Sequence, residues 1–305
     1  MKIYVGVTDS NWYKQLKAAD AKEVNFWAPG NSGFKALKEN ELFLFKLHSP
    51  DNYIVGGGFF VSYSSMPIET AWKAFELQNG VTSRNELYDR IRKYRSKNNK
   101  IHDNEYIGCT ILTDVFYFDR PDWIPIPDDW SMNIVKGKGY DTATDIGWKL
   151  YQDVQIRLQG HSLSSENLSE ADRYTTSLTK HRIGQSAFRV LVMDAYQKRC
   201  AISGEKTLPV LQAAHIKPYA SEGPHQVSNG IFLRSDIHTL FDAGYITIDP
   251  DYTIDVSQRL HQDYGNGKDY YKFDGQKLLV LPEDLRNIPS KEYLEWHNKN
   301  VFIER

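Results

Sequence analysis

The chain has 305 residues, of which 41% are hydrophobic and 13% aromatic, and its net charge is -2. This length suffices for about two domains with packed cores, and the balanced charge excludes a protein that coats nucleic acid with its whole surface. No apolar run reaches the ~20 residues that span a bilayer, and the first residues lack the apolar middle of a signal peptide. We therefore expect a soluble, cytoplasmic protein. Cys109 and Cys200 are the two cysteines, so neither a disulfide framework nor a structural zinc is expected, and both should be buried.

The first 140 residues predict a β-rich domain with helices. Short strands between turns run from residue 3 to about residue 63, and ELFLFKL (residues 41–47) alternates as a strand does, with Phe43 and Phe45 toward the interior. Three glycines interrupt NYIVGGGFFVSY (residues 52–63), which favours a bulge or barrel corner over a ligand contact. Helices are expected over residues 66–75 and 85–94, and a further strand over residues 107–118.

The most basic stretch of the chain lies between residues 84 and 100. It holds seven lysines and arginines against Glu86 and Asp89. Phosphate contacts supply affinity for DNA that does not depend on sequence. A phosphate-binding face is therefore predicted, and a merely solvated helix face is the alternative. The residues of this predicted face are Arg90, Arg92, Lys93, Arg95 and Lys97.

A helix over residues 142–159 and a stretch rich in Ser and Thr over residues 160–182 predict a helical linker, residues 141–182. The second unit, residues 183–305, opens with an amphipathic helix that should end before Ser203. VLQAAHI (residues 210–216) and GIFLR (residues 230–234) are expected strands. Asp236 and Gly244 can begin and end a helix between them, and residues 245–256 predict a hairpin.

This order of strand, loop, strand and helix provides three candidate reactive side chains. His238 and Asp242 are four residues apart and share one helix face. Imidazole and carboxylate form a partial shell for Mg²⁺ or Mn²⁺. His215, at the end of the first strand, can take a proton from water while such an ion stabilises charge on a phosphate. The pattern indicates metal-assisted phosphodiester hydrolysis, whereas His225 and His297 are interpreted as core histidines.

The segment AAHI followed by SNGIFLRSDIHTLFDAG resembles the HNH nuclease motif on a ββα-metal finger, and the resemblance covers most of residues 183–256. It implies that His215 is the general base, that Asn229 holds the loop and orients the base, and that His238 binds one divalent ion. Asp242 stands where some members carry a further ligand. Many members place a ligand directly before the base, where this chain has Ala214. Either His238, Asp242, water and phosphate hold the ion, or the site is weakened.

The segment VNFWAPGNSGFKALKENELFLFKLHSPDNYIVGGGFF resembles the EVE domains of the PUA superfamily. In such readers a modified base leaves the helix and lies between aromatic rings, where polar groups read its edge. The resemblances together imply an α+β fold with a PUA/EVE-like β-barrel domain (residues 1–140), the helical linker and an HNH ββα-metal domain. The predicted base pocket consists of residues within the resembling segment, namely Trp27, Asn25, Asn31, Phe34, Lys46 and His48.

The fused architecture is similar to EVE-HNH modification-dependent restriction endonucleases, which act in phage defence. It implies a type IV-like enzyme that flips 5-methylcytosine or 5-hydroxymethylcytosine out of double-stranded DNA and cuts nearby. A nuclease that reads another mark, phosphorothioate or a glucosylated base, is one alternative. A binding protein with a decayed HNH unit is another, and RNA is a further alternative ligand. Because one HNH site cuts one strand at a time, double-strand cleavage implies a homodimer or two visits.

Overall fold

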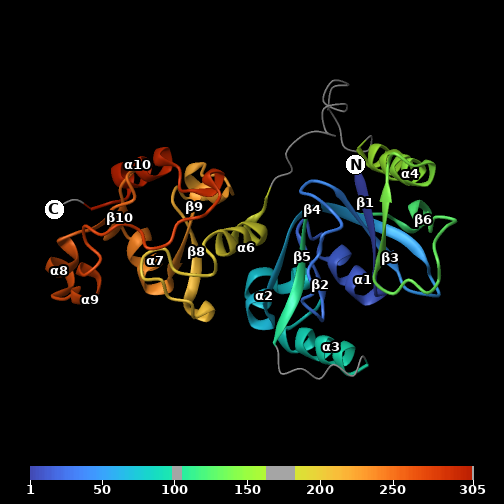
Figure 1. Ribbon diagram of the computed structural model, residues 1–305, viewed down its shortest axis with the longest axis horizontal. Helices are drawn as coiled ribbons and strands as arrows, with labels where there is room; N and C mark the ends of the chain where they lie inside the picture. Colours follow the sequence, from blue (N-terminus) through green and yellow to red (C-terminus); the bar gives the residue numbers. More distant parts are fainter. Residues whose placement is uncertain (98–104, 163–182, 304–305) are drawn as a thin grey trace. The chain divides into compact units, whose positions relative to one another are not determined.

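The computed structural model describes residues 1–97, 105–162 and 183–303 (Figure 1). Contacts within the chain divide it into two compact units, residues 1–182 and 183–305. The division falls after residue 182, where the predicted linker ends. No helix in the described part of the chain is long and apolar enough to cross a membrane.

The first unit is built on a seven-stranded mixed sheet, which confirms the expected α+β class. The strands follow the order β2–β5–β4–β3–β1–β7, and β6 pairs with β4. β1 and β3 run parallel, whereas the other neighbours run antiparallel. Among the described residues this order does not close on itself, so the sheet is open rather than a hydrogen-bonded barrel. The bounds are β1 (Lys2–Thr8), β2 (Val24–Ala28), β3 (Leu42–Leu47), β4 (Tyr53–Pro67), β5 (Tyr106–Tyr117), β6 (Ile124–Pro125) and β7 (Gly137–Asp141).

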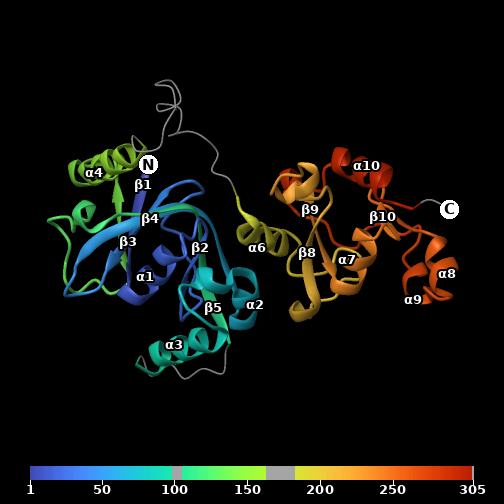
Figure 2. The ribbon, with the colours of Figure 1, turned by 180° about the vertical axis from the view of Figure 1, so that it is seen from behind.

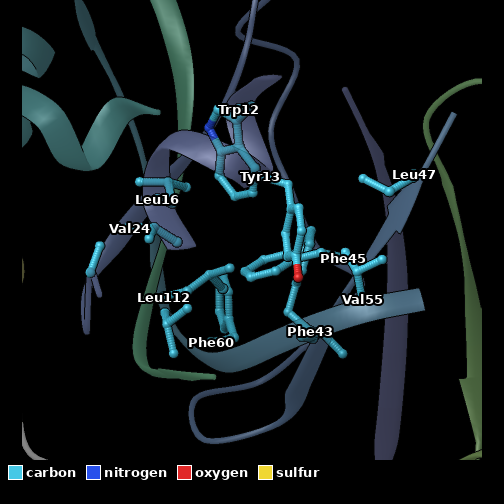
Figure 3. Close-up of a cluster of buried hydrophobic side chains, with 13 residues drawn as sticks. Trp12, Tyr13, Leu16, Val24, Phe43, Phe45, Leu47, Val55, Phe60 and Leu112 are labelled. Atoms are coloured by element: carbon cyan, nitrogen blue, oxygen red, sulfur yellow. The ribbon is translucent and has the colours of Figure 1, made fainter. Parts of the chain in front are cut away.

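Strand β3 is buried on both faces, which explains why its sequence is apolar almost throughout. Phe43 and Phe45 are buried, as expected, and pack with Trp12 of helix α1 (Ser10–Ala18) in one cluster. Figure 3 shows this cluster, in which the side chains of α1 meet those of β3 and β4. Leu42 and Leu44 belong to a second cluster on the other face. The single strand thus separates two cores.

The three glycines of β4 allow neighbouring strands to approach closely. A Cβ atom on Gly57 would lie 2.5 Å from the carbonyl oxygen of Phe43, and one on Gly58 would lie 2.9 Å from the side chain of Val115. The register shifts after Gly57 and again after Phe60. The register shifts confirm the expected bulge. The close contacts explain the glycines, because a larger residue would force the strands apart.

In the described part of the first unit, the α-helices α1, α2, α3 and α4 accompany this sheet (Figure 1). α1 begins where the Asp9 carboxylate accepts a hydrogen bond of 2.8 Å from the backbone of Trp12. The others are α2 (Ile68–Phe75), α3 (Arg84–Lys97) and α4 (Asp145–Ser162). α4 is not the expected linker: Leu150 and Val154 are buried in the second cluster of the first unit. Hydrophobic burial therefore fixes this helix to the sheet, and residues 163–182 lie outside the described residues.

The second unit contains the expected strand, loop, strand and helix, seen from both sides in Figures 1 and 2. β8 (Leu211–His215) and β9 (Gly230–Arg234) are antiparallel, with His215 opposite Gly230. α7 (Ser235–Asp242) follows directly and ends before Gly244, whose φ is +78°. The other elements are α6 (Gln185–Ala195), β10 (Ile246–Ile248), β11 (Ile254–Val256), α8 (Arg259–Tyr264), α9 (Lys268–Tyr271) and α10 (Lys291–Asn300).

Helix α6 is shorter than its apolar pattern predicts. It ends at Ala195, because Gln197 and Lys198 adopt left-handed backbone conformations with φ values of 49° and 59°. The chain then turns, and buried Cys200 accepts a weak hydrogen bond of 3.4 Å from the backbone of Arg234. α6 nevertheless reaches the hairpin, since a Cβ atom on Gly230 would lie 2.4 Å from Val192. It therefore forms one wall of the pocket that contains His215.

Candidate active site

A pocket of about 310 Å³ lies in the second unit. Its walls come from α6, from β8 and the loop after it, from α7 and from the C-terminal helix α10 with the residue that follows it. His215, His238 and Asp242 all line it, so the structure brings together three of the residues that the sequence singles out. The remaining lining residues are Gln185, Phe188, Arg189, Ala213, Ile216, Pro218, Tyr219, His297 and Val301.

Asn229 holds the loop that joins the two strands. Its side chain is fully buried, and its amide nitrogen donates to the carbonyl oxygens of Lys217 at 2.9 Å and Pro224 at 3.0 Å. Its amide oxygen accepts from the backbone N–H of Lys217 at 2.9 Å. The backbone of Ile216, directly after His215, donates to the carbonyl of Asn229. One side chain thus ties both ends of the loop beside the end of β8.

His215 is the last residue of β8, and its ring stacks on Phe188 of α6 with the centroids 4.0 Å apart. Burial lowers the pKa of His215 to about 4, and the neighbouring imidazole of His225 acts in the same direction. Arg189 and His238 also lower this pKa, whereas Asp242 raises it. The imidazole is therefore neutral at pH 7, which is the form that can accept a proton.

His238 and Asp242 face each other on one turn of α7, with His238 Nε2 3.1 Å from Asp242 Oδ2. The Nδ1 atom of His238 lies 2.8 Å from Gln212 Oε1, an acceptor that fixes the proton on Nδ1 and leaves a lone pair on Nε2. Adjacent ligands of an octahedral ion with bonds of about 2.1 Å lie about 3.0 Å apart. The two donor atoms therefore fit neighbouring positions on one Mg²⁺ or Mn²⁺ ion.

The protein supplies few ligands at this site. Within the described ranges, no group of three His, Cys, Asp or Glu side chains is arranged to hold a metal ion. Ala214, at the position where many HNH proteins carry a ligand, is fully buried. An ion held by His238 and Asp242 would complete its shell with water and phosphate oxygens, as Mg²⁺ commonly does.

The sequence patterns did not assign three polar residues to the site. Gln212 orients His238, Arg189 adds an exposed guanidinium to the pocket wall, and the Nδ1 atom of His225 lies 3.0 Å from His215 Nε2. His225 is thus not the independent core histidine that was expected. The position of His225 in the loop between β8 and β9 was a signal that it lies near the site. A loop, however, has no regular spacing from which its contact with His215 could be predicted. His297 does behave as a core histidine, because its ring bonds Phe241 O and Thr247 Oγ1.

Comparison with known proteins agrees with this geometry. Residues 200–249 match the family model described as HNH endonuclease. The second unit carries an HNH nuclease domain. A domain of this kind indicates a phosphodiester hydrolase, and HNH nucleases typically use a divalent metal ion. No curated protein matches the chain.

Solved structures show weaker likeness. The ASCH protein from Zymomonas mobilis is 10% identical with a TM-score of 0.35 over 49% of this chain and 94% of its own. The modification-dependent TagI restriction endonuclease is 12% identical with a TM-score of 0.29 over 92% and 76%. The phosphorothioation-dependent restriction endonuclease ScoMcrA is 14% identical with a TM-score of 0.20 over 72% and 48%. Scores of this size do not establish a shared activity.

In the first unit, the six predicted base-pocket residues do not meet in one place. Asn25, fully buried, and Trp27 both bond to Asn79, at 2.9 Å each. Phe34 instead packs into the aromatic core around Phe43.

The remaining three base-pocket residues lie elsewhere. Lys46 is buried toward the other core, where Asn52 accepts its hydrogen bond at 2.7 Å and the Trp130 ring lies 5.4 Å away. Asn31 and His48 are exposed. A single pocket built from all six residues is therefore wrong, because Phe34 packs against Phe43 in one core whereas Lys46 points toward Trp130 in the other.

The predicted phosphate-binding face of α3 is also smaller than expected. Arg90 pairs with Glu86 at 2.7 Å, and Arg95 donates to the carbonyl oxygens of Pro29 and Tyr106 at 3.0 and 2.7 Å. These two guanidinium groups stabilise the first unit itself. Arg92 and Lys93 are exposed and remain available to phosphate, whereas the side chain of Lys97 lies outside the described residues.

Proposed function

We propose that the protein is a modification-dependent DNA endonuclease of the type IV-like restriction class. The first unit would bind double-stranded DNA that carries 5-methylcytosine or 5-hydroxymethylcytosine, and the HNH domain would hydrolyse a phosphodiester bond nearby. The observation that carries the proposal is the shared pocket, in which neutral His215 lies with the His238–Asp242 pair and Arg189. A base, a cation-binding pair and a phosphate-binding guanidinium are what this reaction requires.

The residues divide the reaction among them. His215 takes the proton of a water molecule whose oxygen attacks phosphorus, so that a new P–O bond forms as the bond to the leaving oxygen breaks. His238 and Asp242 would hold a divalent ion, which would supply Lewis-acid stabilisation of the charge on the phosphate and the leaving oxygen. Arg189, which lines the same pocket, can hold a phosphate oxygen. Asn229 keeps the loop beside His215 in place.

The reading role of the first unit rests on the EVE resemblance and on exposed charge. Arg92 and Lys93 would contact phosphates, which positions the unit without reading sequence. Trp27 is the remaining flat ring of the predicted pocket that lies outside the aromatic core, and its Nε1 is fixed by Asn79 O. We propose that Trp27 stacks on the flipped base. Because one HNH site cuts one strand, double-strand cleavage would require a homodimer or a second visit.

One DNA prepared in three forms tests the proposal. The forms carry cytosine, 5-methylcytosine or 5-hydroxymethylcytosine, and each is incubated with the full chain and Mg²⁺ or Mn²⁺, with His215→Ala as the matched control. Cleavage of the modified forms by the wild type alone supports both roles. Cleavage of all three removes the modified-base reader. Binding of modified DNA without cleavage in either metal would favour the second candidate, a binding protein whose two-ligand metal site has decayed.

A further inference from the structure

The ring of His225 contacts one nitrogen of His215, the proposed general base. Its Nδ1 atom lies 3.0 Å from His215 Nε2, and among the described residues it is not part of the pocket wall. Its ring is held in place by Tyr219, which stacks on it in parallel at 4.7 Å with an interplanar angle of 7°. Phe188 lies next to both imidazoles, with centroids 4.0 Å from His215 and 5.7 Å from His225. The two histidines are thus flanked by the rings of Phe188 and Tyr219.

Two neutral imidazoles in contact share a single proton along their hydrogen bond. Burial lowers the pKa of His225 as well as that of His215, so neither ring carries a charge at neutral pH. If His225 donates, both nitrogens of His215 are occupied by protons or accepted bonds, and His215 cannot act as a base. If His215 donates from Nε2, its Nδ1 keeps a free lone pair. Only the second arrangement is consistent with proton transfer from water to His215.

We infer that His225 is a positioning residue for the HNH site: its Nδ1 accepts the Nε2–H of His215 and so fixes the tautomer in which His215 Nδ1 is the basic atom. This inference rests on the proposed nuclease function for its consequence in catalysis, but not for the hydrogen bond itself. A ring partner that sets a tautomer acts as carboxylate or carbonyl partners do for other catalytic histidines. Tyr219 contributes by restricting rotation of the His225 ring.

Two substitutions separate the acceptor from the ring. His225→Asn keeps an oxygen that can accept from His215 Nε2, because the Asn amide occupies the place of the Nδ1 side of the ring. His225→Phe keeps the flat ring and its stacking on Tyr219 but removes the acceptor. His261→Asn is the matched control, since His261 is an exposed residue of α8. All are made in the full chain, and thermal melting establishes that each variant folds.

The first measurement is side-chain ¹⁵N NMR of His215, which distinguishes protonation at Nε2 from protonation at Nδ1. The wild type, His225→Asn and the control should show Nε2–H with Nδ1 unprotonated, and His225→Phe should lose this single tautomer. The second measurement is single-turnover cleavage of modified DNA. We expect His225→Phe to slow cleavage at least ~10-fold, since a general base contributes about 10²–10⁴-fold, and His225→Asn to restore most of the rate.

The outcomes distinguish the two proposals. A wild-type His215 protonated on Nδ1 overturns the inference, as does a His225→Phe variant that keeps both tautomer and rate. The expected tautomers without any DNA cleavage by the wild type would leave the hydrogen bond established and refute the nuclease function instead.

Discussion

Replacement of Asn229 by alanine tests whether one buried side chain holds the active-site loop. The wild-type side chain makes three hydrogen bonds of 2.9–3.0 Å, two to carbonyl oxygens and one from the Lys217 amide. Each such bond contributes about 1 kcal/mol net, so the variant should open the loop more easily by about 3 kcal/mol. Since 1.4 kcal/mol corresponds to a factor of ten, protection of the Lys217 amide from hydrogen exchange should fall about a hundredfold.

Hydrogen exchange followed by mass spectrometry measures this effect on the full chain. Peptides that cover residues 216–229 should lose protection, whereas peptides of the first unit should not change. Asn300→Ala is the matched control, because Asn300 is exposed and its amide makes one hydrogen bond, 2.7 Å from the carbonyl oxygen of Trp296. Cleavage by Asn229→Ala should also fall at least ~10-fold, since His215 immediately precedes the tied backbone. Unchanged loop protection together with unchanged cleavage would refute the role assigned to Asn229.

Three further predictions concern the proton, the metal and the DNA. Burial holds the pKa of His215 at about 4, so its neutral form persists to low pH. The single-turnover rate at saturating Mn²⁺ should therefore be flat from about pH 8 to about pH 6 and should fall only below about pH 6. A fall centred near the ordinary histidine pKa of about 6.5 would contradict this prediction. His238→Ala or Asp242→Asn should weaken Mn²⁺ binding at least ~10-fold in calorimetry, and unchanged affinity would exclude these ligands. Arg92→Gln with Lys93→Gln should weaken binding to modified and unmodified DNA alike and reduce the salt dependence by about two ions, as filter binding at several salt concentrations can measure.

The HNH finger could be predicted from sequence because its signals are local. The strand that ends on His215, the loop that contains Asn229 and the helix that presents His238 and Asp242 follow one another within thirty residues. Side chains four apart on a helix must share a face, so the metal pair required no knowledge of tertiary structure. The end of α6 could not be placed in the same way, because Gln197 and Lys198 are not residues that break helices, and their left-handed conformations depend on the surrounding fold.

The base pocket of the first unit shows what sequence proximity cannot provide. Its six predicted residues lie within about twenty-five positions of each other. Even so, Phe34, in the loop before β3, packs into one core, whereas Lys46 on β3 points toward Trp130 in the other. Partners such as Asn79 and Trp130 come from distant segments. The same limit hid Arg95, whose guanidinium has backbone carbonyls as partners rather than phosphates. Which face a residue occupies depends on strand pairing, and that pairing is long-range.

The direction in which residue 214 points from β8 agrees with the absence of a metal ligand at Ala214. Successive residues of a strand point to opposite faces; Ala213 and His215 line the pocket, whereas Ala214 is fully buried away from it. A carboxylate at position 214 would lose its hydration in the core, which costs several kcal/mol unless it is paired. We therefore expect Ala214→Asp to lower the melting temperature without tighter Mn²⁺ binding, and Ala213→Asp to tighten Mn²⁺ binding by adding a third ligand beside His238 and Asp242. Calorimetric titration of both variants with Mn²⁺ tests which of the two positions faces the ion. Tighter binding by Ala214→Asp alone would contradict this expectation and would show that the end of β8 rotates when the ion binds.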